Sequence, residues 1–480
     1  MTEPRRIVIV GGGITGLAAA HAALLRAREL RRPVTVTVLE RSGRFGGNLV
    51  TERVDGFLLD GGPDSWVTSK PQASALAREL GLGGALVGTN EATRRFFVAH
   101  RGVLHAVPEG LVLGVPTKLR PLVRTNLFSW PGKLRMAMEP LIPARRDASG
   151  PDESIADFAR RRLGREAAEL LVAPLLGGIS AGDASDLSVR SAFPQLVAME
   201  REHGSLVRGM LAVRRAREAS GSGTAGSAFV SLPGGVGQLV DALVERLRAL
   251  GADLRLRVPV RALARSGGGS RAAWTFEVEG GDAIPADEVL LAVPGYAAAA
   301  LAAGLDDALA GQLAAFRNSS TATVFLGYRR AQVTHPLDGV GFVVPRAAGQ
   351  PVLAGTWVSS KWDHRAPAGH ALLRVFFGGP AAEPLLRGDD AGLVLPARAA
   401  LRDLMAIDAE PVLARVFRFD RASPQMRIGH AVAVAALQAR LASALPGVHV
   451  AGGGYEGIGI PDCIRQGTER GRALVDASPR

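Results

Sequence analysis

The segment from residue 7 to residue 40 constrains the fold more than any other part of the chain. Residues 7–10 are apolar and β-branched, which predicts a buried strand. Residues 17–30 are rich in Ala, Leu and Arg and predict a helix, and residues 34–39 predict a second strand. A strand, a helix and a second strand in this order predict a nucleotide-binding α/β unit with a parallel sheet.

Three glycines, Gly11, Gly13 and Gly16, lie at the start of this helix in the pattern G-x-G-x-x-G. Gly11 allows a tight turn, Gly13 lets the backbone approach a pyrophosphate, and Gly16 lets the helix pack closely on the sheet. The helix N-terminus offers free N–H groups to phosphate. At the end of the second strand, the Glu40 carboxylate can accept hydrogen bonds from ribose hydroxyls. Together these features predict dinucleotide binding rather than a glycine-rich turn without a ligand.

The composition indicates an ordinary globular protein of two or three domains. With 480 residues and 47% hydrophobic content, the chain can bury large cores. Cys463 is the only cysteine, which excludes an internal disulfide and suggests a reducing compartment. The first predicted strand begins at residue 7, so we expect no cleavable signal peptide. The sequence has no run of about 20 apolar residues that would predict a transmembrane helix.

The net charge of +12 comes mostly from arginine. Nucleic-acid binding is not favoured, because no dense basic run has aromatic residues interleaved and only 5% of residues are aromatic. Anionic lipid or an anionic small substrate suits this charge better. A solvated basic surface without a partner explains it equally well.

The order of predicted elements divides the chain into a dinucleotide-binding Rossmann-like domain in three parts and two other domains. Residues 91–215 predict a substrate hairpin followed by a helical insertion, punctuated by prolines. Residues 296–420 predict an antiparallel sheet, a usual platform beside a cofactor. The parts assigned to the nucleotide-binding domain are residues 1–90, 216–295 and 421–480.

Further glycine turns favour a flavin over a nicotinamide cofactor. Arg44, Gly46 and Gly47 form a second turn behind the ribose acid, where an arginine can reach phosphate. A third turn follows at residues 61–63, and a fourth glycine-rich loop at residues 452–459 precedes a helix at the other end of the chain. FAD is long enough to touch both ends. The N-terminus of that last helix, behind Gly457, Ile458 and Gly459, would stabilise an anionic reduced flavin through its dipole.

These motifs together resemble the flavin amine oxidase superfamily and, within it, the oxygen-dependent protoporphyrinogen oxidases. The resemblance extends over nearly the whole chain. It implies FAD bound without a covalent link, and oxidation of a porphyrinogen, protoporphyrinogen IX, to protoporphyrin IX by oxygen with release of hydrogen peroxide in haem biosynthesis. It also implies a cytoplasmic protein that is peripheral on the inner face of the cell membrane, often as a homodimer. The residues that carry the resemblance are in the segments 8–20, 39–47, 56–66, 94–108, 178–183, 231–243, 423–430 and 451–464.

The resemblance also implies site residues. Arg95 matches an arginine that meets a substrate propionate, and Phe342, Thr356 and Phe376 match positions that sandwich the macrocycle. Asp64 and Thr356 depart from the residues usual at their positions. The residues predicted to contact FAD are Gly11, Gly12, Gly13, Ile14, Thr15, Gly16, Glu40, Arg41, Arg44, Gly46, Gly47, Asn48, Gly62, Pro63, Asp64, Ser65, Val260, Phe419, Gly457, Ile458 and Gly459.

The substrate chemistry predicts an apolar pocket with few polar anchors, because a porphyrinogen is a large apolar ring with carboxylate arms. Arg95, next to two phenylalanines, could pair a carboxylate bidentately. We identify no catalytic acid or base and no metal cluster, since the histidines lack metal-ligand spacing. We interpret Cys463 as a packing residue. Catalysis would then depend mainly on orientation and on flavin electronics.

Several alternatives remain open. Coproporphyrinogen III, with four carboxylates rather than two, would suit the arginine-rich balance and yield coproporphyrin III. An amine oxidase or a carotenoid desaturase is further off, because Trp and Tyr are scarce. A non-catalytic escort protein on the same fold is a rival of another class. By resemblance, residues 111–141, which mix apolar and basic side chains, would face a membrane.

Overall fold

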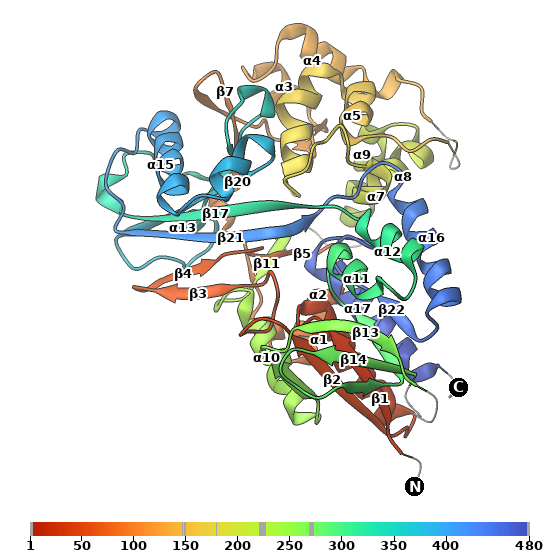
Figure 1. Cartoon of the computed structure of the whole chain (residues 1–480). Coiled ribbons are helices and arrows are strands. Elements are labelled where there is room, and N and C mark those ends of the chain that lie inside the picture. Colours follow the sequence, from red (N-terminus) through yellow and green to blue (C-terminus); the bar gives the residue numbers. More distant parts are fainter. Residues whose placement is uncertain are drawn as a thin grey trace.

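The computed structural model describes residues 3–145, 147, 150–178, 180–219, 227–267 and 273–477. A five-stranded parallel sheet forms its nucleotide-binding part, in the order β12-β2-β1-β16-β22 (Figure 1). Its strands come from the start, middle and end of the chain. They are β12 (Asp253–Leu256), β2 (Val34–Glu40), β1 (Arg5–Val10), β16 (Glu288–Leu291) and β22 (Val448–Val450).

Both faces of this sheet are buried, as the continuous apolar run in β1 predicts. Ile7 and Ile9 pack under three helices, α1 (Ile14–Glu29), α10 (Gly237–Ala249) and α17 (Ile460–Asp476). Val8 and Val10 point to the opposite face, because side chains alternate along a strand. That face is covered by α11 (Gly295–Ala302), α12 (Asp307–Ala314), α16 (His430–Ala444) and the small sheet β13 (Val260–Arg265), β14 (Trp274–Val278) and β15 (Ile284–Ala286).

A seven-stranded sheet forms the second part, in the order β21-β17-β20-β19-β18-β7-β8. All neighbours are antiparallel except β18 and β7. The predicted antiparallel sheet is therefore confirmed. The predicted hairpin of β7 and β8 joins this sheet through the parallel pair of β18 and β7. The strands are β21 (Leu413–Pro424), β17 (Asn318–Arg329), β20 (His370–Gly378), β19 (Val352–Trp357), β18 (Gly339–Val343), β7 (Arg95–His100) and β8 (Val103–Ala106).

The third part is the helical insertion, which Figure 1 places at the end of the molecule opposite the termini. The sequence predicts one helix over residues 196–215, but Gly204, with φ of 69°, ends α8 and a second helix begins at Leu206. Residues 168–177 form a π-helix, inside which Pro174 cannot donate an N–H to the preceding turn. The insertion contains β9 (Leu111–Val112), β10 (Val115–Pro116), α3 (Leu119–Arg124), α4 (Trp130–Ala137), η3 (Glu139–Leu141), α5 (Ile155–Leu163), α6 (Arg165–Ala167), η4 (Ala168–Gly177), α7 (Val189–Ala192), α8 (Pro194–His203) and α9 (Leu206–Ala219).

Shorter elements connect these three parts. Among the residues described, no helix is long and apolar enough to cross a membrane. The connecting elements are β3 (Thr51–Val54), β4 (Phe57–Asp60), β5 (Trp66–Val67), α2 (Gln72–Glu79), η1 (Gly83–Ala85), β6 (Val87–Gly88), η2 (Glu91–Thr93), β11 (Phe229–Ser231), η5 (Arg330–Gln332), η6 (Arg346–Ala348), α13 (Val358–Lys361), η7 (Pro380–Ala382), α14 (Glu383–Leu386) and α15 (Ala391–Met405).

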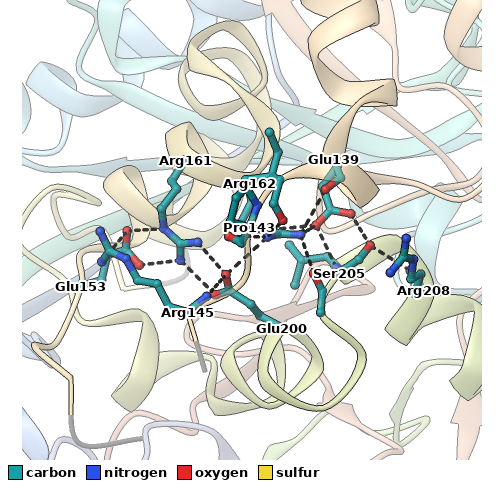
Figure 2. Close-up of polar contacts among 12 residues, drawn as sticks. Glu139, Pro143, Arg145, Glu153, Arg161, Arg162, Glu200, Ser205 and Arg208 are labelled. Atoms are coloured by element: carbon teal, nitrogen blue, oxygen red, sulfur yellow. Dashed lines mark hydrogen bonds and ion pairs between the residues drawn. The ribbon is translucent and has the colours of Figure 1, made fainter. Parts of the chain in front are cut away.

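A buried network of arginines and glutamates holds the helical insertion together (Figure 2). Glu139 and Arg162 are both fully buried, and the Glu139 carboxylate accepts hydrogen bonds from the Arg162 guanidinium at 2.8 Å and from the Leu206 N–H at 2.9 Å. Glu200 then bridges Arg161, at 2.6 Å, and Arg162, at 3.4 Å. The network therefore joins η3, α5, α8 and the start of α9, which are far apart in sequence.

We predict that Arg162→Met destabilises the protein by about 3–5 kcal/mol, because the Glu139 carboxylate would stay buried without its partner. Equilibrium denaturation followed by far-UV circular dichroism measures this loss. The double variant Glu139→Leu with Arg162→Met should recover only part of the stability, because both charges are removed but the Leu206 and Val207 N–H groups lose their acceptor. A single variant as stable as the unmodified protein would show that the pair contributes little.

Candidate functional site

The first glycine turn has the geometry that its pattern predicts. Gly11 has φ of +108°, and a Cβ there would lie 2.4 Å from the Ala292 carbonyl oxygen. A Cβ on Gly16 would lie 2.0 Å from the Gly11 carbonyl oxygen, so the close approach of helix to strand is confirmed. Gly13 differs, since only the Gly47 Cα lies within 4 Å of its Cβ position. This open side of Gly13 leaves room for a phosphate at the N-terminus of α1.

Glu40 lies at the end of β2 with its carboxylate already oriented. It accepts hydrogen bonds from the Gly12 and Ser42 backbone N–H groups, each at 2.8 Å. An ionised carboxylate has about four lone-pair sites, so it can still accept hydrogen bonds from two ribose hydroxyls. The ribose contact itself stays a prediction.

The second turn lies directly against the first. The Gly46 N–H donates to the Gly12 carbonyl at 2.8 Å. The Arg44 guanidinium donates to the carbonyls of Phe45 and Leu49, both at 3.3 Å, and of Gly47 at 2.5 Å. In this structure Arg44 therefore holds the turn in place instead of reaching out to a phosphate. Of the neighbouring predicted residues, Arg41 is exposed, and the Asn48 amide donates to the Ala422 carbonyl at 3.2 Å.

The third turn, residues 61–65, lies between the second turn and the seven-stranded sheet. A Cβ on Gly62 would lie 1.9 Å from the Asn48 carbonyl oxygen, so the two turns are in contact. The Asp64 carboxylate pairs with Lys361 at 2.7 Å and accepts from the Trp362 indole at 3.1 Å. Burial acts to raise the pKa of Asp64, but Lys361 and Arg374 hold that pKa well below its usual range. The Asp64 side chain thus faces other protein groups, so any ligand contact there falls to its backbone.

The fourth loop, residues 452–459, is built around the first turns of α17. The Gln466 side-chain carbonyl accepts from the backbone N–H groups of Gly452 at 3.2 Å and Glu456 at 3.4 Å. Gln466 is 2% exposed, and its Nε2 has no hydrogen-bond partner among the described residues. Gly457 has φ of +126°, and a Cβ there would lie 2.7 Å from Asp462. A buried donor without a partner fits a site completed by a ligand.

The two ends of the chain meet through the backbones of α1 and α17, which lie in the lower half of Figure 1. Cβ atoms on Gly467 and Gly471 would lie 2.3 Å from the Thr15 carbonyl oxygen and 2.2 Å from the Ala19 carbonyl oxygen. These contacts show that both helices run in the same direction. By the same contacts, α17 begins about six residues further out than α1, roughly 9 Å at 1.5 Å per residue. The two helix N-termini thus face the same side at different depths, which suits an elongated dinucleotide.

One face of the seven-stranded sheet is directed at this cofactor site. Thr323 donates from its hydroxyl to the Gly61 carbonyl at 2.9 Å and is paired with Phe376 in the next strand. Paired residues share a face, as do residues two apart in a strand. Phe376, Arg374 and Thr356 therefore lie on the cofactor side, and Phe376 and Thr356 are partly exposed there.

The helical insertion borders the same face on its other side. Ala354, paired with Phe376, packs against the core of the insertion, together with Val343 and Val98 from the next strands. The partly exposed surface of Thr356 and Phe376 therefore lies between the insertion and the glycine turns. We define this surface as the platform.

Phe342 does not belong to the platform, and its predicted place beside Thr356 and Phe376 is wrong. It is paired with Gly355 and Phe97, which face the opposite side of the sheet. There it is 1% exposed and packs in a core with Trp357 under α15. A contact of Phe342 with a bound ring is not compatible with this register, because adjacent residues of a strand point to opposite faces.

Arg95 is also placed away from the platform. Its guanidinium lies 5.3 Å from the centre of the Phe97 ring and pairs with Asp338 at the exposed start of β7. Since Phe97 belongs to the core under α15, the Arg95 side chain lies on that side of the sheet. The sequence predicts that Arg95 lies in one site with Thr356 and Phe376. The structure does not bring these residues together.

The remaining predicted residues fall near the glycine turns or within the core. The Phe419 ring lies 3.6 Å from the Cβ position of Gly62. Val260 begins β13, two residues after Val258, whose N–H donates to the Glu40 carbonyl at 3.0 Å. Cys463 is buried in α17, and burial raises the pKa of its thiol to about 11. Among the described residues, no group of three or more His, Cys, Asp and Glu side chains could hold a metal ion.

Two residues of the site escaped prediction. Gln466 organises the last loop, and Arg374 lies buried behind the third turn. For Arg374 the sequence does carry a signal, because a single charge interrupts the apolar run ALLRVFF. Such a charge is buried only when the fold supplies partners for it. Gln466 carries no comparable signal, since polar residues are common in helices.

The class of protein follows from comparison with known families. Residues 14–474 match the model of the flavin containing amine oxidoreductase family. The chain belongs to this family, its cofactor is FAD, and it is an FAD-dependent oxidase. The glycine turns, the open side of Gly13 and the unpartnered Gln466 amide fit this cofactor.

Individual relatives of the chain are named as porphyrinogen oxidases. The chain is 37% identical to coproporphyrinogen III oxidase of Bacillus subtilis (strain 168), with 96% of each chain covered. It is 29% identical to chloroplastic protoporphyrinogen oxidase of Oryza sativa subsp. japonica, over 98% of this chain and 86% of the relative. Among solved structures, a protein of Exiguobacterium sp. 255-15, provisionally named protoporphyrinogen oxidase, superposes with a TM-score of 0.86 at 33% identity, with 99% of each chain covered.

We predict that Gly471→Ala destabilises the protein by about 1–3 kcal/mol, because the added methyl group forces α17 away from the α1 backbone. Flavin absorbance per protein should fall as well, since both helix N-termini shift. Gly311→Ala in α12 is the matched control, as its Cβ position meets no atom within 4 Å. That control should be neutral or gain up to about 1 kcal/mol. Equal behaviour of the two variants would contradict the role of the close contact.

Proposed function

We propose that the protein oxidises a porphyrinogen to the corresponding porphyrin in haem biosynthesis, with oxygen as acceptor and hydrogen peroxide released. The observation that carries this proposal is the platform, the partly exposed surface of Thr356 and Phe376 that faces the glycine turns. A tetrapyrrole ring is large and mainly apolar, so its burial against Phe376 can contribute several kcal/mol, at about 25 cal/mol per Å². Bound FAD would accept hydride from the substrate.

The protein's own groups then orient the reactants and exclude water. The sheet supplies one wall and the insertion another, while the turn at residues 61–65 keeps its backbone next to Phe376 through Thr323. The dipole at the N-terminus of α17 favours negative charge at its end, which supports an electron-rich reduced flavin. No acid–base residue is assigned, so positioning carries most of the rate enhancement.

Coproporphyrinogen III is the substrate that we favour, and protoporphyrinogen IX is the second candidate. The relative at 37% identity is named for the former, and the relative at 29% for the latter. The four carboxylates of coproporphyrinogen also suit an arginine-rich chain better than two. Arg346 lies at the edge where the insertion meets the sheet, donating to the Gly182 carbonyl at 2.6 Å with its side chain 36% exposed.

We predict that kcat/KM for coproporphyrinogen III exceeds that for protoporphyrinogen IX at least tenfold, measured side by side from porphyrin fluorescence in air. Anaerobic mixing with either substrate should bleach the flavin absorbance, and admission of oxygen should restore it. A tenfold preference for protoporphyrinogen IX would reverse the order of the two candidates. A colourless protein that takes up no FAD would instead favour the non-catalytic escort reading.

We also propose that the insertion attaches the protein to the inner face of the cell membrane from the cytoplasm. Seven large apolar side chains between β9 and η3 are 42–73% exposed. Figure 1 places α3 and α4 at the end of the molecule opposite the termini. We name this set the ridge, and it consists of Val112, Leu119, Val123, Trp130, Leu134, Met138 and Leu141.

Basic residues next to the ridge divide into two groups. Arg120 and Arg124 are exposed on α3, where they could meet anionic lipid headgroups. Lys133 and Arg135 are engaged inside the insertion, with the Lys133 amine on the Val123 carbonyl at 2.9 Å and Arg135 on the Arg161 carbonyl at 2.6 Å. The ridge thus combines an apolar surface with a small number of available cations, as interfacial surfaces do.

We predict that Leu134→Asp combined with Leu141→Asp abolishes most co-sedimentation with vesicles that contain anionic lipid, because two charges would have to enter the interface. Leu395→Asp on α15 is the matched control, since Leu395 is 63% exposed and lies outside the ridge. It should sediment with vesicles like the unmodified protein. Retention of the double variant on vesicles would exclude the ridge as the attachment surface.

A further inference from the structure

Arg374 is a buried cation in the middle of the apolar strand β20. It is 5% exposed, and one terminal nitrogen donates to the carbonyls of Gly61 at 2.7 Å and Gly62 at 2.6 Å. A buried guanidinium is costly unless hydrogen bonds compensate it, so this arrangement exists only where the fold requires it. The two carbonyls belong to the third glycine turn. Arg374 therefore joins the sheet to the cofactor domain at that turn.

The guanidinium lies next to the platform, on the same face of the sheet. It is 4.3 Å from the centre of the Phe376 ring and 5.2 Å from that of Phe325. Its Nε has no hydrogen-bond partner among the residues that the structure describes. Only part of the hydrogen-bonding capacity of Arg374 is therefore used by the protein, while its charge stays close to the half-open surface.

The charges around Arg374 do not cancel. Asp64 pairs with Lys361 at 2.7 Å, and Asp60 pairs with Arg365 at 3.1 Å. Each carboxylate therefore has its own cation, and Arg374 remains as a third positive charge beside them. Burial lowers the pKa of Arg374 to about 10, which is still well above neutral pH. One net positive charge consequently stays buried behind the turn.

The hydrogen bonds of Arg374 also determine how the turn is oriented. In a planar trans peptide, the N–H points opposite to the C=O. Because the Gly61 carbonyl points at Arg374, the N–H of Gly62 points away from it. Pro63 has no N–H, so of the two peptide groups whose carbonyls Arg374 binds, the Gly61–Gly62 peptide is the one that presents an N–H on the other side.

We propose that Arg374 is a positioning residue for the flavin, which orients the Gly61–Gly62 turn through its paired hydrogen bonds and supplies the uncompensated positive charge that favours the reduced, anionic flavin. The first effect acts on FAD in both oxidation states. The second acts on the reduced state alone. This role depends on the FAD cofactor and not on which porphyrinogen is the substrate.

The test measures the FAD dissociation constant and the flavin midpoint potential in Arg374→Met and Arg374→Lys. We expect Arg374→Met to weaken FAD binding at least tenfold and to lower the midpoint potential by about 30 mV, which is a tenfold change for a two-electron couple. Arg374→Lys keeps the charge but loses the paired geometry. It should weaken FAD binding and leave the potential unchanged.

Two further variants keep the proposal falsifiable if Arg374→Met fails to fold. Asp64→Asn removes a negative charge from the same cluster, so the potential should rise instead of fall. Arg398→Met, on the surface of α15, should change neither quantity. The electrostatic role would be overturned if the potential were unchanged in both Arg374→Met and Asp64→Asn. If Arg374→Met does not fold, an unchanged potential in Asp64→Asn overturns it. Unchanged FAD affinity in Arg374→Lys would overturn the positioning role.

Discussion

The close contact between the backbones of α1 and α17 is the constraint on which the rest of the structure depends. Gly467 and Gly471 allow this contact, because any side chain there would collide with backbone atoms of α1. The contact brings helices separated by about 450 positions together on one face of the parallel sheet. Both helix N-termini then face the same side at different depths, and one elongated cofactor can meet both.

The cofactor site is completed by contacts between turns rather than by individual side chains that reach toward a ligand. Gly46 bonds to Gly12, Gly62 touches the Asn48 carbonyl, and Arg44 holds its own loop. Such backbone contacts leave little freedom, so the turns are largely preorganised before any cofactor binds. The seven-stranded sheet is attached to this assembly through Thr323 and Arg374, both of which bond to the carbonyl of Gly61. The platform therefore has a defined position relative to the flavin turns.

Much of this arrangement was predictable from the sequence, for identifiable reasons. The first βα unit, the parallel sheet and the strands of the antiparallel sheet follow from local patterns of glycine and of apolar alternation. Prediction from the sequence fails where it has to decide on which face of a sheet a strand residue lies. Phe342 and Phe376 are both aromatic residues in apolar strands, yet Phe342 packs under α15 and Phe376 faces the flavin turns. One residue of register decides between these faces, and an apolar run on both sides of a sheet leaves no alternation to read.

By itself, the sequence determined the nucleotide-binding motif and the family, because both depend on local spacing and on motifs. Tertiary structure alone decided which charges belong to the site. Arg95 had the composition expected of a substrate anchor, but the fold directs it to Asp338 at the surface. Arg374 was not predicted as a site residue, but the fold places its guanidinium behind the third turn. The physical reason is that burial and partners of a charged side chain depend on elements distant in sequence, and these meet only when the sheets and helices pack.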